Sequence, residues 1–319
     1  MVSLKVFAEG VTKEIKEYLS PAYTNVECKV IEKRENNGHF SVGVAIIRAG
    51  ENSAPIISME PFYEAVRNGA PLESIMQGLS EMAVQSMNFK IDIPSQLNEF
   101  SKVEEYLGVR LVNTKANKKE LNNLPHIDIE GLSLIPVIRF PLPDKSGYQS
   151  MKITEELRKM WGVSKEQIFE RAWENEELPR LQEVGEDISD VRISKKLFEI
   201  EEDSLEITEK SLFMLTNQRA IDGAAMIAFP GVIEKLDELF PKGFYVVPSS
   251  IHETLIIPKR MDDNKEYLEY MGKMVRDMNH KYTKITEILS DRIYEYDKER
   301  GKIRQVPESI EKERGEMEL

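Results

Sequence analysis

The sequence has 319 residues, enough for two or three domains, and its hydrophobic content of 41% is sufficient for cores of ordinary density. A formal net charge of -13 without any basic block argues against a protein that binds nucleic acid, because phosphate binding requires clustered Lys and Arg. The single cysteine, Cys28, excludes an intrachain disulfide framework and an all-cysteine metal cluster, as is usual in a reducing compartment. No apolar run approaches the roughly 20 residues of a membrane span and the N-terminus lacks a signal-peptide core, so we expect a cytoplasmic protein that does not bind membranes.

Residues 1–100 are predicted to form a unit of one helix, a β-hairpin and further helices. The apolar spacing over Val2–Leu19 indicates an amphipathic helix. Apolar and charged residues then alternate over Val26–Glu35, and Asn36-Asn37-Gly38 supplies a turn before the second strand, Phe40–Ile47. A third strand and two helices are expected after the hairpin, over Pro55–Met59, Phe62–Asn68 and from Leu72 onward.

Residues 101–182 are predicted to form a middle α+β segment. Its apolar runs Val109–Val112 and Leu132–Phe140 are typical of strands, and Glu155–Asn175 has helical spacing with a break at Gly162. The acidic stretch 183–209 loses this periodicity and is interpreted as a linker, and the charged residues 301–319 are interpreted as a tail.

Residues 210–300 are predicted to form a β-β-α-β-β-α domain, which makes the chain an α+β protein of two to three small units. The expected strands are Leu212–Thr216, Ala224–Phe229, Phe244–Val247 and Thr254–Ile257, with a helix that starts after Pro230 between the second and third strands. In the last helix, Asn264–His280, we expect an apolar stripe against the sheet, formed by Leu268, Met271, Val275 and Met278. The methionines at positions 271, 274 and 278 could form an adaptable binding face, but core packing is the interpretation we favour.

Several short motifs occur together in a fixed order along the chain. They are FYEAVRNG after Ser58-Met59-Glu60, LVN at Asn113, Pro125-His126, LTN at 215–217, GAA at 223–225, PSSIHE at 248–253 and LSDRIYEYD at 289–297. This combination resembles a widespread uncharacterised bacterial family, the domain-of-unknown-function family fifty-six-eighty-eight, which is common in gut anaerobes. The resemblance extends from about Gly38 to Asp297 and implies one multi-domain fold, but it implies no activity.

The pair His252-Glu253 has the same residues as the start of the zinc-binding motif of zinc proteases. The zinc-binding helix needs a second histidine four residues after the first, where this chain has Ile256 in a segment of strand character. The four histidines, at positions 39, 126, 252 and 280, would need carboxylates such as Glu60, Asp128, Glu253 or Asp291 to complete a metal site. Since nothing in their spacing requires this, we predict no metal site and expect His252 and Glu253 to hydrogen-bond to a sheet edge or a loop.

The sequence contains only part of the set of residues that nucleophilic catalysis requires. Ser249, Ser250 and His252 could supply a nucleophile and a base, but the Gly-x-Ser-x-Gly turn of serine hydrolases is missing. Capping of the local backbone is the role we expect for the two serines. There is no glycine-rich phosphate loop either, so we predict no cofactor site.

The remaining polar candidate is Asn217, which most simply forms a turn together with Asp222.

Because no set of catalytic residues is complete, we predict a non-enzymatic interaction or regulatory protein, which binds a protein partner or forms a homo-oligomer. The alternative is a hydrolase-like or metal-assisted enzyme with its site in an interdomain cleft around His252 and Glu253, with His126 or Asp291 as a further catalytic residue.

Overall fold

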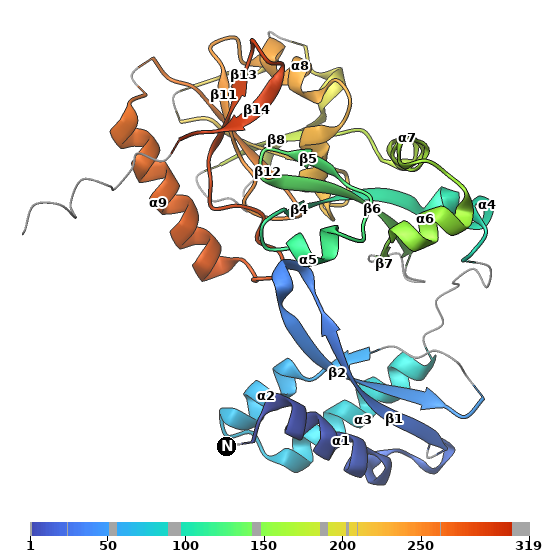
Figure 1. Ribbon diagram of the computed structural model, residues 1–319. Coiled ribbons are helices and arrows are strands. Elements are labelled where there is room, and N and C mark those ends of the chain that lie inside the picture. The colour runs from blue at the N-terminus through green and yellow to red at the C-terminus, as the bar shows by residue number, and fades with distance from the viewer. Residues whose placement is uncertain are drawn as a thin grey trace, which may run out of the picture. The chain divides into compact units, whose positions relative to one another are not determined.

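The protein is described by a computed structural model in which two compact units are distinguished (Figure 1). The first unit is Met1–Ile93 with Pro141–Ser146, and the second is Pro94–Phe140 with Gly147–Leu319. The structure describes residues 2–23, 25–50, 56–88, 97–141, 148–185, 191–201, 204–208, 210–261 and 263–307. None of the helices within these ranges has the length and the apolar character needed to cross a bilayer.

In the described part of the first unit, three α-helices pack against a three-stranded antiparallel sheet of order β1-β2-β3. Its elements are α1 (Leu4–Tyr18), β1 (Val26–Arg34), β2 (Phe40–Arg48), β3 (Ile56–Ser58), α2 (Glu60–Arg67) and α3 (Leu72–Asn88). The predicted hairpin is confirmed, since β1 and β2 pair along their whole length. Asn37 and Gly38 adopt the positive φ angles of 58° and 70° that the turn requires.

The described residues of the second unit form two sheets. The four-stranded sheet has the order β4-β6-β5, with β7 paired to β6. Its strands and the helices near them are α4 (Phe100–Val103), β4 (Leu107–Asn113), α5 (Lys118–Leu121), β5 (Ile127–Ile129), β6 (Leu132–Pro141), β7 (Tyr148–Lys152), α6 (Glu155–Trp161) and α7 (Lys165–Asn175). The predicted break between α6 and α7 is confirmed: Gly162 has a φ of 70°, and a capping box of Ser164 and Gln167 starts α7.

The seven-stranded sheet is antiparallel and has the order β14-β13-β11-β12-β10-β8-β9. Its elements are β8 (Arg180–Val184), β9 (Val191–Lys196), β10 (Leu212–Thr216), α8 (Val232–Leu239), β11 (Phe244–Val247), β12 (Thr254–Pro258), α9 (Lys265–Tyr282), β13 (Tyr294–Asp297) and β14 (Lys302–Gln305). Part of the stretch expected as an acidic linker therefore forms β9, and part of the expected tail forms β14. The chain is α+β, as predicted.

Strand β14 also contacts the four-stranded sheet. The side chain of Gln305 donates a hydrogen bond of 2.7 Å to the carbonyl oxygen of Glu130, in the turn between β5 and β6. Glu130 and Gly131 hold positive φ angles of 47° and 87° in this turn. The last described strand is thus tied to a residue 175 positions earlier in the chain.

The expected strand Ala224–Phe229 is wrong, because this segment forms a 3-10 helix, η6 (Gly223–Ala228). Both edges of β10 are already occupied, by β12 and β8, so a strand that follows β10 directly has no free edge beside it. Asp222 turns the chain with a φ of 55°, and the amide of Ala225 then donates back to its carbonyl oxygen. The apolar run is buried on all sides as a tight helix.

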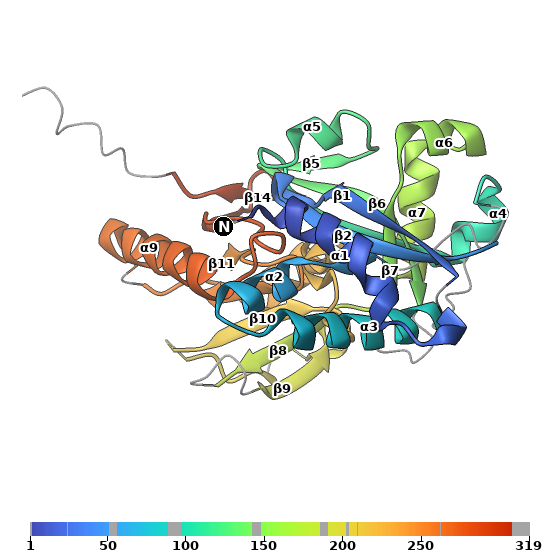
Figure 2. The same ribbon diagram turned by 90° about the horizontal axis from the view of Figure 1, so that it is seen from below.

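The prediction that Met278 belongs to the buried stripe of α9 is also wrong. Met271 and Val275 are buried in a core with Tyr245 of β11, but Met278 has 46% of its surface exposed. Asn279 occupies the buried position instead, because its amide donates hydrogen bonds within the interior. In both ribbon views α9 and α7 lie at opposite ends of the second unit (Figures 1 and 2).

Candidate functional site

An ion pair with a buried carboxylate joins the two sheets of the second unit. Asp222 is almost completely buried and precedes η6. Arg110 of β4 binds both of its carboxylate oxygens, with 2.7 Å from Nε to Oδ1 and 2.9 Å from Nη2 to Oδ2. This two-point geometry matches the fork of a guanidinium to a carboxylate and fixes the turn after β10 against the four-stranded sheet.

A second arginine extends this pair into a network. Arg139 of β6 places Nη2 3.3 Å from Asp222 Oδ2, and its Nη1 donates to Glu176 Oε1 at 2.5 Å. Both residues are also anchored to Val109 of β4: Arg139 donates to its carbonyl oxygen, and Glu176 accepts from its amide at 2.9 Å. Two arginines and two carboxylates thus balance each other in charge, which limits the cost of their burial.

The network determines the ionisation of Asp222. Burial alone would raise the pKa of this carboxyl group, but Arg110 and then Arg139 outweigh burial and hold the pKa below its ordinary value. Asp222 is therefore an anion at neutral pH and accepts hydrogen bonds only. It cannot serve as a general acid at that pH.

Two glycines allow the close packing of this network. A Cβ atom at Gly108 would lie 2.4 Å from Nη1 of Arg139, and one at Gly223 would lie 2.1 Å from Oγ1 of Thr216 and 2.4 Å from the carbonyl oxygen of His252. Contacts this short are not tolerated by real side chains. At Gly223 the overlap involves backbone atoms, so this position needs glycine for space. At Gly108 a side chain would instead displace the ends of Arg139 and Glu176 from the network.

Three of the sequence motifs meet at the turn around Asp222. Thr216 donates its hydroxyl to the carbonyl oxygen of His252 at 2.8 Å, and the Asp222 amide donates to Nδ1 of the same histidine at 3.3 Å. The Ala224 amide donates to the carbonyl oxygen of Ile251 at 3.2 Å. The LTN, GAA and PSSIHE motifs are thus joined by hydrogen bonds that shape two loops.

The candidate residues Ser250, His252 and Glu253 interact within one of these loops. The Ser250 hydroxyl donates to Glu253 Oε1 at 2.6 Å and accepts from the His252 amide at 3.0 Å. The His252 ring uses Nδ1 to accept from Asp222, and its Nε2 lies 4.0 Å from Glu287. The serine hydroxyl is therefore directed to a carboxylate and a backbone amide, not to the imidazole ring.

The other histidines have partners of their own. His126 lies 3.8 Å from Asp128, and His280 lies 3.5 Å from Asp291. Asp291 also accepts a hydrogen bond of 2.8 Å from Nδ2 of the Asn279 side chain. Among the residues that the structure describes, no three or more His, Cys, Asp or Glu side chains gather in a group that could hold a metal ion.

Asn217, the last predicted candidate, closes the loop after β10. Its Oδ1 accepts from the amides of Arg219 and Ile221, at 3.2 and 3.3 Å, and its Nδ2 donates to the Ile221 carbonyl oxygen at 2.8 Å. Both ends of the side-chain amide are thus engaged with the backbone of the turn.

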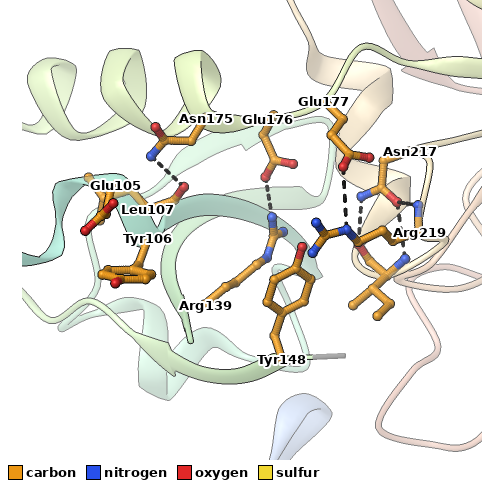
Figure 3. Close-up of a pocket in the computed structure, with 11 residues that line it drawn as sticks. Glu105, Tyr106, Leu107, Arg139, Tyr148, Asn175, Glu176, Glu177, Asn217 and Arg219 are labelled. Carbon is orange, nitrogen blue, oxygen red and sulfur yellow. Dashed lines mark hydrogen bonds and ion pairs between the residues drawn. The ribbon is translucent and has the colours of Figure 1, made fainter. Parts of the chain in front are cut away.

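Asn217 also lines a small pocket of about 120 Å³ (Figure 3). In Figure 3, Arg139 reaches Glu176, and Arg219 lies between Glu177, 3.5 Å away, and the ring of Tyr148, 4.8 Å away. The volume corresponds to about four water molecules and is well below the roughly 300 Å³ at which ligand pockets begin. Both arginines of the pocket are paired, Arg139 with Glu176 and Arg219 with Glu177, which leaves less of their positive charge for a ligand.

In contrast to the charged pocket, α9 has an exposed apolar surface, on which four large side chains follow one another at intervals of four residues. We call this set the apolar row; it consists of Tyr270, Met274, Met278 and Tyr282, with 66%, 44%, 46% and 66% of their surface exposed. Residues four apart on a helix lie on the same side of it, so the row is continuous. Exposed large apolar side chains gathered in this way are a feature of interaction surfaces.

Sequence reasoning did not single out Arg110 or Arg139, although a signal for both was present. Each is a charged residue in the middle of an apolar strand, in LGVRLVN and PVIRFP. A charge in such a strand needs a buried partner of opposite sign. The identity of that partner, Asp222, cannot be read from local spacing.

Comparison with known proteins identifies a family and nothing more specific. A model described as a family of unknown function, DUF5688, matches residues 4–298. No curated protein and no solved structure matches the chain.

Proposed function

We propose that this chain, which belongs to the family of unknown function DUF5688, has a non-enzymatic role in protein interaction. The second unit acts as a rigid support, and the apolar row on α9 is the surface that a partner protein covers. The observation that carries this proposal is the exposure of two tyrosines and two methionines on one side of one helix.

The chemistry of the apolar row suits an interface. Tyrosine and methionine are enriched at the centres of protein interfaces, because tyrosine combines a large apolar area with a polar tip and methionine adapts its shape. Covering such a row gains about 25 cal/mol for each Å² of apolar surface removed from water. Below the row, Met271 and Val275 anchor the helix in the core, so the surface is held in place before a partner arrives.

The arrangement of the polar residues supports this role over the hydrolase-like alternative. A site around His252 and Glu253 would require a second reactive group, such as His126 or Asp291, next to them. His126 pairs with Asp128, however, and Asp291 pairs with Asn279 and His280. The hydrogen bonds of His252 and Glu253 hold loops together, which is a structural use of these side chains.

The proposal includes a cytoplasmic location and a partner that is neither nucleic acid nor membrane. Two features of the sequence support it: the net charge of -13 and the presence of one cysteine only.

Photo-crosslinking in the native host tests the proposed function. A benzoyl-phenylalanine at position 270 should give crosslinked protein adducts, whereas the same group at the exposed Lys119 of α5 should give none. Mass spectrometry of the adducts then identifies the partner, whether a second copy or another protein. A chain that yields no adduct from position 270 would not support a protein-interaction role for α9.

A further inference from the structure

We infer that the partner on α9 is a second copy of the same chain, packed antiparallel to the first about a two-fold axis at the middle of the apolar row. The inference rests on the proposed function, because it specifies the partner of the same surface. It is carried by two patterns along α9, one apolar and one charged.

The first pattern is a palindrome. The apolar row reads Tyr-Met-Met-Tyr in either direction, at positions 270, 274, 278 and 282. A two-fold contact is self-complementary, so a residue i that meets a residue j in one half must find the same pair in the other half. In an antiparallel arrangement, Tyr270 faces Tyr282 of the second copy and Met274 faces Met278.

The second pattern is a charged row directly beside the first, one residue earlier at each step. It reads Glu269, Lys273, Asp277 and Lys281, all of them exposed. The first and last residues of this row have opposite charges, and so do the two in the middle. An antiparallel partner therefore places Glu269 opposite Lys281 and Lys273 opposite Asp277, whereas a parallel partner in register places like charges together.

The charged row also acts within a single helix, in addition to favouring an antiparallel partner. Charges of opposite sign four residues apart also stabilise a single helix, by about 0.2–0.5 kcal/mol for each pair. Stabilisation of one helix does not, however, require exposed tyrosines and methionines alongside. The apolar row thus supplies the contact, and the charged row gives it a direction.

The size of the contact sets its expected strength. The row from Tyr270 to Tyr282 is about 18 Å long at a rise of 1.5 Å per residue. One pair of helices of this length is at the low end of specific interfaces, so we expect a dimer with a Kd on the order of micromolar.

Sedimentation velocity of the full chain tests the inference directly. The sedimentation coefficient should rise from that of a monomer to that of a dimer as the concentration passes through the micromolar range. Met274→Asp combined with Met278→Asp should weaken the dimer at least about tenfold, because both residues lie at the centre of the contact. Met261→Asp is the matched control: Met261 is 91% exposed and lies outside α9, so this variant should dimerise as the wild type does. Circular dichroism on all variants should show that α9 remains folded.

Charge reversal tests the direction of the contact. Lys273→Glu alone and Asp277→Lys alone each place like charges opposite one another in an antiparallel homodimer, and each should weaken it several-fold. A mixture of the two variants forms opposite pairs at both sites and should restore association. Loss of stability of a single helix cannot explain this rescue.

The outcomes separate the two proposals. A chain that stays monomeric while crosslinks from position 270 reach another protein overturns the second-copy inference and leaves the proposed function standing. A chain that dimerises, but whose two charge variants do not rescue each other, overturns the antiparallel arrangement. Dimerisation that is unchanged by the double aspartate variant overturns the assignment to α9.

Discussion

Arg110 binds both carboxylate oxygens of Asp222, a residue 112 positions further along the chain. The contact joins the middle of β4 to the turn that leaves β10; the Asp222 carboxylate is buried, and the Arg110 side chain is partly buried with 18% of its surface exposed. Its partners in the network, Arg139 and Glu176, link the same turn to β6 and to the end of α7. The geometry of the second unit thus depends on one small group of charges.

Removal of one partner of this ion pair should strongly destabilise the second unit. Arg110→Leu leaves the Asp222 carboxylate buried without its main counter-charge, so we expect a loss of about 3–5 kcal/mol in the free energy of unfolding. Urea denaturation followed by tryptophan fluorescence measures it for this unit alone, because both tryptophans, Trp161 and Trp173, lie there. Glu199→Gln, which removes an exposed ion pair to Lys196, should cost less than about 1 kcal/mol. Equal effects of the two variants would contradict a central role for the buried pair.

Acid should remove the contribution of Asp222. Because the folded-state pKa is held below the unfolded value of about 3.9, the stabilisation is fully present above that value and is lost as the pH falls through the lower, folded pKa. From pH 7 to about pH 5 this group should therefore contribute no slope to a plot of stability against pH. Asp222→Asn should flatten the decline below about pH 4 relative to the wild type. A decline of the same steepness in both proteins would assign it to other carboxylates.

His252→Ala should destabilise the second unit through the loss of a hydrogen bond. The variant leaves the Asp222 amide without its acceptor, which should cost about 1–3 kcal/mol. His252→Asn keeps a side-chain oxygen near the position of Nδ1 and should recover part of the loss. Differential scanning calorimetry of the three proteins measures the effect. A melting profile of the alanine variant that matches the wild type would favour the hydrolase-like alternative instead.

Gly223→Ala should be far more harmful than an alanine at the partly exposed Gly272 of the same unit. The new methyl group would overlap the backbone of the PSSIHE loop, and relieving this overlap should cost about 1–3 kcal/mol. Gly272→Ala in α9 is the control. Its methyl group would meet its nearest neighbours at 3.9 Å, and alanine favours the helix by about 0.5–1 kcal/mol. Urea midpoints should thus shift in opposite directions for the two variants.

Much of the fold could be predicted because it depends on local patterns. The hairpin turn at Asn37 and Gly38 and the break at Gly162 follow from residues that accept positive φ. The run Ala224–Phe229 could not be assigned in the same way, because a short buried apolar run has the same composition as a strand and as a tight helix. Only the positions of β8 and β12 on both sides of β10 decide between them, and these are non-local facts.

The candidate surfaces could be predicted only in part, for a similar reason. Helical periodicity finds α9, but it cannot decide whether Met278 or Asn279 faces the core, because the two differ by one residue. Hydrophobicity favours the methionine. The structure selects the asparagine, whose amide has partners at Ser290 and Asp291. The pairing of Arg110 with Asp222 is likewise beyond any local window.

The bond from Gln305 to Glu130 has a consequence for how this protein is made. A ribosome delivers the chain from its N-terminus, so the first unit, whose described elements end at Asn88, can fold while synthesis continues. The second unit, by contrast, cannot be complete until its final strand, β14, has been translated, because that strand forms one edge of the seven-stranded sheet and donates the bond to Glu130. Nascent chains of this protein should therefore depend on chaperones chiefly for residues beyond position 94.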